Sequence, residues 1–428
     1  MSASCDTVRH DLPRRASVLR NASALYALQI ANYAIPLATL PYLIRALGPD
    51  SYGVLSMAYA LVFLLVLAVD AGFNTLAARR LARPDINSLE VSATYLANQV
   101  IKLFAAALAF LLLVVLSVTF DQIAAHRAVY LCTYPIVIGS LLFPTWLFQG
   151  LEVMHLTTVC SVTGRLAATA GILLLVRGPE DLALAALLQA SATAVSGCLA
   201  LLVVVGHLRL SLRPGRARLI KEIRAMVASA RTLAPAEFLT NAASNSGVLI
   251  LGLFATEAAV GAYAAVEKLG RACLNAFQPV VKALLPKLTC DWHREPSAWR
   301  ERATQWTMRI CGAALLTGLA IAIFAEPVLD ILFGETWGQH AALLRTLAAW
   351  VVLSIVSLAV ANFLLLAPGN SRGLARSLAV STTIQVVLCL AGAMASGATG
   401  LVHALIAAEF LRICLFVREC RAYLNGEA

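Results

Sequence analysis

The sequence predicts an all-α membrane protein with twelve transmembrane helices, arranged as two six-helix lobes that are related by a pseudo-twofold axis along the membrane normal and enclose a central cavity. Hydrophobic residues make up 60% of the 428-residue chain and charged residues 13%, whereas soluble domains are about half apolar and a quarter charged. The apolar residues form twelve runs, each near the ~20 residues that a helix needs to cross a membrane. Basic residues gather in alternate connections between these runs. These three observations favour a polytopic membrane protein over a large soluble core.

The connections between the predicted spans are short, so almost the whole chain is expected to lie in the membrane. The spans cover residues 22–44, 53–76, 94–119, 128–149, 157–177, 181–206, 231–254, 258–281, 306–329, 341–367, 375–395 and 398–417.

The first two spans form a hairpin with features that a simple anchor does not need. Gly48 and Gly53 border the tight turn between the spans, where glycine can end one helix and let the next begin. Pro36 and Pro41 interrupt the first span, and each removes a backbone donor. In a membrane such prolines are tolerated where the freed carbonyl faces protein or a water-filled cavity. We therefore expect these four residues to shape helices that line a cavity.

Lysine and arginine are distributed unevenly between the two sides of the predicted helices. The two termini and the connections after the even-numbered spans hold 24 of them when Arg231, Arg376 and Arg412 of the adjoining spans are counted with them. The opposite connections, counted with Arg177 at the end of its span, hold only Arg45, Arg127 and Arg177. Because basic loops stay in the cytoplasm, both termini are predicted to be cytoplasmic. The net charge of +10 therefore reflects membrane topology, and we expect no nucleic-acid partner.

A basic, amphipathic segment divides the chain near its middle. Residues 216–230 place apolar side chains on one helical face and basic side chains on the other, as in a helix that lies on the membrane surface. We therefore predict an N-terminal lobe (1–210), an interfacial linker helix (211–230) and a C-terminal lobe (231–428).

Two further patterns concern the second half of the chain. Trp292, Trp299 and Trp306 recur every seven residues among charged residues, which predicts a second surface-lying anchor. Gly261 follows Gly53 by 208 residues, in a segment of similar spacing between the first and second helices of a six-helix half. This short similarity supports two halves that run in the same direction.

The first third of the chain resembles a known family. The residues that carry the resemblance are Asn21, Leu25, Tyr26, Pro36, Pro41, Tyr42, Leu43, Arg45, Leu47, Gly48, Pro49, Tyr52, Gly53 and the run from Asp70 to Asn74, with a second match from Phe143 to Glu152 that includes Trp146 and Gly150. They are similar to the N-terminal signature and the fourth helix of polysaccharide flippases. These are the O-antigen and exopolysaccharide repeat-unit transporters of the multidrug/oligosaccharidyl-lipid/polysaccharide exporter superfamily.

The resemblance implies a function and a set of partners. Such a flippase translocates undecaprenyl-diphosphate-linked oligosaccharide repeat units across the bacterial inner (plasma) membrane during surface polysaccharide biosynthesis, while the polyprenyl tail stays in lipid. The implied partners are this lipid-linked oligosaccharide, membrane lipids, and a polysaccharide polymerase with its chain-length regulator.

Basic side chains inside the predicted spans are the candidates for substrate binding, because a charge in hydrocarbon is costly and should face the bundle interior or a partner. The candidates are Arg165, Lys268, Arg271, Lys102 and Arg309. Arg165 has no carboxylate within a helical turn, which favours a position on a cavity wall. Lys268 and Arg271 share a helix face and are predicted either to hold a diphosphate or, for Arg271, to pair with Glu267.

The remaining intramembrane charges have competing interpretations. Lys102 and Arg309 lie near predicted helix ends and could extend toward the membrane surface instead of a cavity. Asp70 is a candidate for coupling transport to an ion, or it could pair with the Arg79-Arg80 segment as a structural lock. Glu237, in the seventh predicted span, is a second candidate for ion coupling.

The sequence shows no pattern that predicts catalysis, a metal or a cofactor. Its ten cysteines are scattered without metal-ligand spacing, and no nucleophile or nucleotide-binding motif is present. We therefore expect a protein that is not an enzyme. The alternatives are a membrane-embedded polysaccharide polymerase or ligase, another exporter of the same superfamily (a drug antiporter or a peptidoglycan-precursor flippase), and a structural scaffold. Short outward loops disfavour the polymerase, and interior cations disfavour a transporter of cationic drugs.

Overall fold

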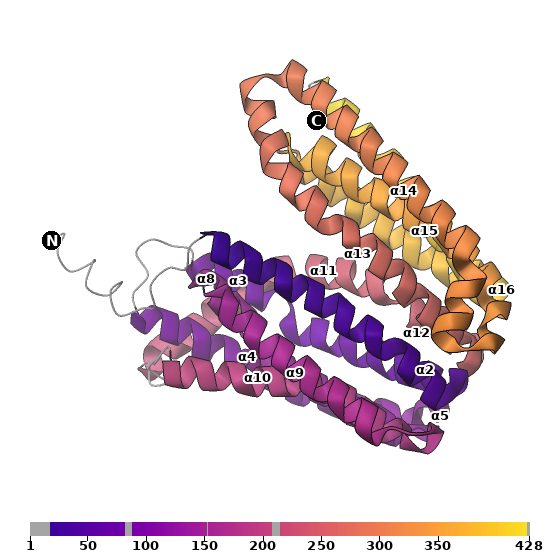
Figure 1. Ribbon diagram of the computed structural model, residues 1–428. Coiled ribbons are helices and arrows are strands. Elements are labelled where there is room, and N and C mark those ends of the chain that lie inside the picture. Colours follow the sequence, from indigo (N-terminus) through magenta and orange to yellow (C-terminus); the bar gives the residue numbers. More distant parts are fainter. Residues whose placement is uncertain (1–17, 82–87, 152, 208–214, 426–428) are drawn as a thin grey trace. The chain divides into compact units, whose positions relative to one another are not determined.

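The computed structural model describes residues 18–81, 88–151, 153–207 and 215–425. Within these ranges every regular element is a helix (Figure 1). Packing groups the chain into two compact units. The first contains Met1–Thr39 and Ala58–Asn241, and the second contains Leu40–Met57 and Ala242–Ala428. The tip of the predicted N-terminal hairpin therefore groups with the second half of the chain. The predicted domain boundaries 1–210, 211–230 and 231–428 stay a prediction.

The first helix, α2 (Val18–Asp70), runs through residues of both units. Its backbone leaves helical geometry at Gly48, where φ is 75° and ψ is 169°. Glycine has no Cβ and adopts this positive φ readily, so the predicted turn coincides with a true break between two helical segments. The helix α2 continues through Pro36 and Pro41, and their role in shaping a cavity-lining helix stays a prediction.

The other helices of the first unit are mostly shorter than the predicted spans. They are α3 (Phe73–Leu81), α4 (Ser88–Thr119), α5 (Asp121–Ala125), α6 (Arg127–Thr133), α7 (Pro135–Leu142), α8 (Thr145–Gly150), α9 (Met154–Leu175), the 3-10 helix η1 (Pro179–Asp181), α10 (Leu182–Leu202), the π-helix η2 (Val203–His207) and α11 (Arg216–Asn245). The fourth predicted span is divided into α6, α7 and α8. Pro135 begins α7 and Pro144 precedes α8, where a proline needs no intrahelical donor.

Close packing of α7, α9 and α10 shapes one side of the first unit. A Cβ atom at Gly164 on α9 would come within 2.3 Å of the Ser196 hydroxyl on α10. Small residues at such positions let helix backbones approach, which stabilises membrane helices that gain little from hydrophobic burial against lipid.

The second unit contains longer helices, in orange to yellow in Figure 1. They are α12 (Gly247–Gly252), α13 (Glu257–Arg294), α14 (Pro296–Phe333), the 3-10 helix η3 (Glu335–His340), α15 (Ala341–Val360), the π-helix η4 (Ala361–Leu366) and α16 (Ser371–Leu424). The last two predicted spans lie in α16, which departs from helical geometry at Ser396 and Gly397.

Eight helices in the described ranges are long and apolar enough to cross a membrane, which identifies a multi-pass membrane protein. They include ten of the twelve predicted spans, because α2 and α16 each contain two. The other two spans fall on α11 with α12 and on α13. The helix α13 carries Glu267, Lys268 and Arg271 in its first half, and these charges lower its apolar character. Twelve spans in two symmetric lobes stay a prediction.

The predicted interfacial helix is the first part of the continuous helix α11. Part of its apolar stripe packs inside the first unit. Met226 is 0% exposed, and Leu219 and Ile223 contact the same cluster, which includes Phe73. Ile220 and Val227 of the same stripe are exposed, and the interfacial position of this helix stays a prediction. The opposite face remains exposed and basic.

We expect Met226→Ala to lower the free energy of unfolding by about 2–3 kcal/mol, since it leaves a cavity in a closed apolar cluster. The adjacent Val227 is exposed, so Val227→Ala is the matched control and should change stability by less than about 0.5 kcal/mol. Thermal unfolding of the purified protein in nanodiscs compares the two. Equal effects would show that α11 does not pack by the Met226 face.

The predicted tryptophan anchor is also corrected. Trp292 lies near the end of α13 and Trp299 near the start of α14, because the chain leaves the helix at Glu295 and Pro296 begins the next one. The two indole rings pack edge to face with centroids 4.8 Å apart, and Trp299 is only 1% exposed. These residues therefore hold two helices together rather than lying in the membrane surface.

Candidate functional site

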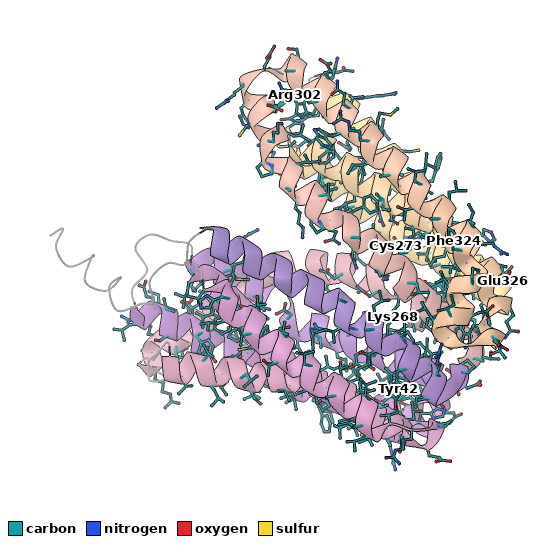
Figure 2. All side chains as sticks on the ribbon, in the orientation of Figure 1. Tyr42, Lys268, Cys273, Arg302, Phe324 and Glu326 are labelled. Carbon is teal, nitrogen blue, oxygen red and sulfur yellow. The ribbon has the colours of Figure 1, made fainter. Side chains whose placement is uncertain are left out.

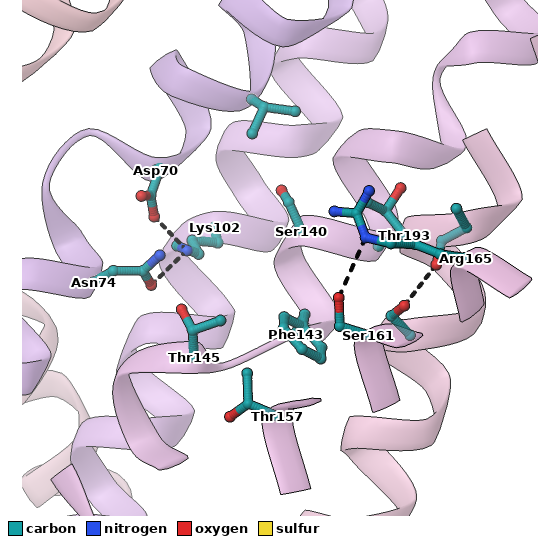
Figure 3. Close-up of a pocket in the computed structure, with 14 residues that line it drawn as sticks. Asp70, Asn74, Lys102, Ser140, Phe143, Thr145, Thr157, Ser161, Arg165 and Thr193 are labelled. Atoms are coloured by element: carbon teal, nitrogen blue, oxygen red, sulfur yellow. Dashed lines mark hydrogen bonds and ion pairs between the residues drawn. The ribbon is translucent and has the colours of Figure 1, made fainter. Parts of the chain in front are cut away.

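A cavity of about 310 Å³ lies inside the first unit. Its wall is formed by α2, α3, α4, α7, α8, α9 and α10. The charged residues in this wall are Asp70, Lys102 and Arg165 (Figure 3). Its polar uncharged residues are Asn74, Ser140, Thr145, Thr157, Ser161, Thr193 and Ser196. The cavity thus offers many hydroxyl groups and a few charges inside a unit made of membrane helices.

Lys102 is held by two partners on one side of the cavity. Its Nζ lies 2.5 Å from Asp70 Oδ1 and donates to Asn74 Oδ1 at 2.7 Å (Figure 3). The lysine is 3% exposed, so its side chain points into the protein and does not extend to the membrane surface. Burying a charge is tolerated when a counter-ion and further hydrogen bonds compensate it.

The predicted partner of Asp70 was wrong. Asp70 pairs with Lys102 on α4, whereas Arg80 pairs with Glu222 of α11. Glu222 also accepts a hydrogen bond from Thr94 Oγ1 at 3.2 Å. The two carboxylates therefore form separate links, one at the cavity and one between α3 and α11.

Arg165 supplies a positive charge that no carboxylate balances within the described residues. It projects from α9, and its Nε donates to Ser161 Oγ at 3.5 Å (Figure 3). Since Lys102 is neutralised by Asp70, the charged residues in the cavity wall sum to one positive charge. A guanidinium in this position can donate two parallel hydrogen bonds to phosphate or carboxylate oxygens.

Lys268 and Arg271 lie in the second unit, on α13, and do not line this cavity. Arg271 pairs with Glu267 at 2.7 Å and lies over the Trp350 ring at 5.7 Å, which agrees with the ion-pair interpretation. Lys268 is exposed, is marked in Figure 2, and donates to the Tyr52 hydroxyl at 2.8 Å. The structure thus separates the predicted cations into two groups.

The remaining sequence candidates lie elsewhere. Arg309 is an exposed residue of α14 whose guanidinium lies over the Trp306 ring at 4.8 Å, and it does not line the cavity. Glu237 belongs to α11, and its side chain lies outside the described part of the structure. The ion-coupling roles of Asp70 and Glu237 stay a prediction.

The second unit contains a buried charged network that sequence reasoning missed. Glu409 of α16 is 7% exposed and accepts from Arg412 Nη1 at 2.8 Å and from Ser354 Oγ at 3.2 Å. Arg412 also donates to Gln385 at 2.5 Å and Ser381 at 3.2 Å. The count of basic residues by side of the membrane takes Arg412 with the C-terminus, but α16 continues well past it. The sequence did contain a signal for this ion pair, because a carboxylate stands three residues before an arginine within a predicted span.

Comparison with known proteins agrees with this architecture. Residues 18–289 match the family described as "Polysaccharide biosynthesis protein". The chain is 28% identical over 278 residues to a protein of Escherichia coli (strain K12), a match that covers 64% of this chain and 65% of that one. It is 24% identical over 414 residues to a protein of Shigella dysenteriae, covering 94% and 100%. Both relatives carry the name "Putative O-antigen transporter".

Two solved structures share the fold at low sequence identity. The inward-facing conformation of a multidrug resistance MATE family transporter of the MOP superfamily superposes with a TM-score of 0.69 at 12% identity, covering 99% of both chains. The lipid II flippase MurJ in an inward closed conformation superposes with a TM-score of 0.71 at 11% identity, covering 94% of this chain and 87% of that one. The family match, the names of the relatives and the shared fold confirm the resemblance noted in the sequence. The chain belongs to the polysaccharide biosynthesis protein family, and it has the fold of these two solved structures.

Proposed function

We propose that this protein is a flippase that moves undecaprenyl-diphosphate-linked oligosaccharide repeat units from the cytoplasmic to the periplasmic leaflet of the bacterial inner membrane. The observation that carries the proposal is the cavity of the first unit, with its hydroxyl-rich wall and the unbalanced charge of Arg165. In this proposal both chain termini lie in the cytoplasm, and a polymerase with its chain-length regulator uses the translocated units. The family membership and the names of the two relatives support transport of polysaccharide precursors.

The wall chemistry of the cavity suits an oligosaccharide better than an apolar ligand. Serine and threonine hydroxyls donate and accept hydrogen bonds, so they can replace water around sugar hydroxyls. Arg165 would bind an anionic group of the substrate head, with the fork geometry that a phosphate requires. The polyprenyl tail would remain in lipid between helices, because the cavity of about 310 Å³ has to hold the head group of the substrate.

The cations of the second unit have a secondary place in the proposal. Lys268 is exposed and its ammonium has no carboxylate partner among the described residues, so it is the candidate there for contact with the diphosphate. Arg271 is neutralised by Glu267, and Arg309 lies on an exposed face. We rank Lys268 above both. Alternating access of two lobes would carry the bound head across the membrane.

A transporter of cationic drugs is the competing function that the fold permits, since a MATE transporter shares it. The net positive charge of the cavity wall disfavours a cationic substrate, because like charges in a medium of low dielectric constant repel strongly. A polymerase or ligase would require catalytic groups, and both relatives are named as transporters.

We expect Arg165→Ala to slow translocation of fluorescent polyprenyl-diphosphate oligosaccharide in proteoliposomes by tenfold or more. Hydrogen bonds to a charged group contribute about 1.5–3 kcal/mol, and every 1.4 kcal/mol corresponds to about tenfold. Arg345→Ala is the matched control, because Arg345 is exposed, pairs with Glu326 and lies outside the cavity.

Two outcomes of this assay would contradict the proposal. An unchanged rate in folded Arg165→Ala would remove Arg165 from the binding site. No translocation by the unaltered protein, with transport of a cationic dye instead, would reject the flippase function. A deletion strain gives the cellular counterpart: lipid-linked single repeat units should accumulate on the cytoplasmic face, whereas accumulation outside would indicate a polymerase.

A further inference from the structure

We propose that the C-terminal end of α16 binds an anionic phospholipid, whose phosphate lies at Arg418 and Arg421 and whose acyl chain follows Ile413 and Val417. A hollow of about 650 Å³ lies on this part of the helix. All the residues that line it come from the final turns of α16, the yellow helix of Figure 1. The hollow belongs to the second unit and shares no residue with the cavity of the first.

The charge of this hollow is unbalanced. Arg418 and Arg421 are three residues apart, so they project from the same side of the helix. Both are exposed, and neither has a carboxylate partner among the described residues. The nearest carboxylate in sequence, Glu419, pairs instead with Arg376 at 3.4 Å. Two unpaired guanidinium groups one turn apart repel each other unless an anion binds between them.

Two other arginines of the second unit are neutralised inside the protein. Arg302 pairs with Asp291 at 2.7 Å, and Arg412 pairs with Glu409 at 2.8 Å. A carboxylate therefore neutralises each of these side chains within the protein. The Arg418 and Arg421 pair is distinct because its charge faces an open hollow.

The order of residues along the hollow matches the order of groups in a lipid. The first turn, with Ile413, Cys414 and Val417, is free of charge, and the arginines and Asn425 follow toward the end of α16. This helix is long and apolar enough to span a membrane, so its apolar turns face acyl chains and its basic end lies at the level of the headgroups. Arginine near a membrane surface attracts anionic headgroups, and its planar fork donates two hydrogen bonds to one phosphate.

The test measures lipid binding and does not depend on transport, so its failure leaves the proposed flippase function untouched. Full-length protein is placed in phosphatidylcholine nanodiscs with increasing phosphatidylglycerol, and native mass spectrometry counts the phosphatidylglycerol that stays bound. We expect the double variant Arg418→Gln/Arg421→Gln to bind about tenfold more weakly. The control Arg294→Gln/Arg372→Gln removes two exposed arginines of the second unit that lie outside the hollow, and should stay within about twofold.

Further arms of the test separate the alternatives. Equal binding by the double variant and the unaltered protein, or equal loss in the control, would overturn the proposal. Displacement of phosphatidylglycerol by an equimolar polyprenyl diphosphate would also overturn it, because the occupant would then be the transported lipid. If the glutamine variant does not fold, Arg418→Lys/Arg421→Lys retains both charges without the fork and should bind several-fold more weakly. Unchanged binding by that lysine variant would contradict the proposed phosphate geometry.

Discussion

Asp70→Ala is expected to lower the free energy of unfolding by about 3–5 kcal/mol, because it leaves the ammonium of Lys102 buried without a counter-ion. The pair lies at 2.5 Å and the lysine is 3% exposed, so water that enters the cavity beside Asp70 replaces the lost carboxylate only in part. Asn74 retains one hydrogen bond to the lysine, but an amide does not neutralise its charge. Thermal unfolding in nanodiscs and the yield of monodisperse protein report the loss.

The control for this prediction removes both charges. Asp70→Leu/Lys102→Met replaces the ion pair by apolar residues, and such replacements of buried pairs are often neutral or stabilising. We therefore expect the double variant to be more stable than Asp70→Ala by about 3 kcal/mol. If both variants lose the same stability, the pair is not what holds α2 and α4 together. A stable double variant that no longer transports would assign Asp70 or Lys102 a role in transport beyond folding.

Gly53→Val and Gly261→Val are each expected to prevent stable folding of the second unit, with a loss of more than about 3 kcal/mol. A Cβ atom at Gly53 would come within 1.9 Å of the Glu257 carbonyl oxygen, and one at Gly261 within 2.1 Å of the Pro49 carbonyl oxygen. Overpacking costs about 1–3 kcal/mol where side chains can move. Here the obstacle is backbone, so the cost exceeds that range.

The matched control is Gly312→Ala on α14, where a new Cβ atom would meet no neighbour within 4 Å. Alanine is favoured over glycine in a helix by about 1 kcal/mol, so this variant should be slightly stabilised. Thermal unfolding and protein yield compare the three variants. If Gly53→Val and Gly261→Val fold as well as Gly312→Ala, the close approach of these two segments does not occur in the membrane.

The contact between these glycines also bears on the predicted internal repeat. Gly261 follows Gly53 by 208 residues, and Glu257 follows Pro49 by the same number. Gly53 faces the Glu257 carbonyl and Gly261 faces the Pro49 carbonyl, so the two contacts are equivalent under the 208-residue offset. The short similarity of spacing in the sequence has a physical origin at this position, because both segments need a residue without a side chain to approach each other.

Among the ion pairs of this protein, those between residues close together in the sequence could be predicted from the sequence. The pair of Glu267 and Arg271 follows from four-residue spacing on a helix, and the structure contains it. Asp70 and Lys102 are 32 residues apart, so their pairing depends on how α2 and α4 pack. The assignment of Asp70 to Arg79 or Arg80 was wrong because proximity in sequence does not determine which helix faces the carboxylate.

The predicted tryptophan anchor and amphipathic helix also show that the sequence does not determine which surfaces pack together. A seven-residue repeat of tryptophan indicates one helical face only if the helix is continuous. Pro296 begins a new helix between Trp292 and Trp299, so the repeat joins two helices and buries one of the rings. Likewise the apolar stripe around Met226 predicted an amphipathic helix, and the sequence did not indicate that Met226, Leu219 and Ile223 of that stripe would contact protein.

The sequence by itself determined that this chain is a multi-pass membrane protein of its family. Long apolar runs must satisfy their backbone groups as helices in lipid, and this requirement depends on composition and length alone. Tertiary structure alone decided which charges meet: Lys102 with Asp70, Arg412 with Glu409, and Arg165 with no carboxylate in the described residues. Helix packing sets these distances, and electrostatic attraction in a medium of low dielectric constant changes steeply over a few ångströms.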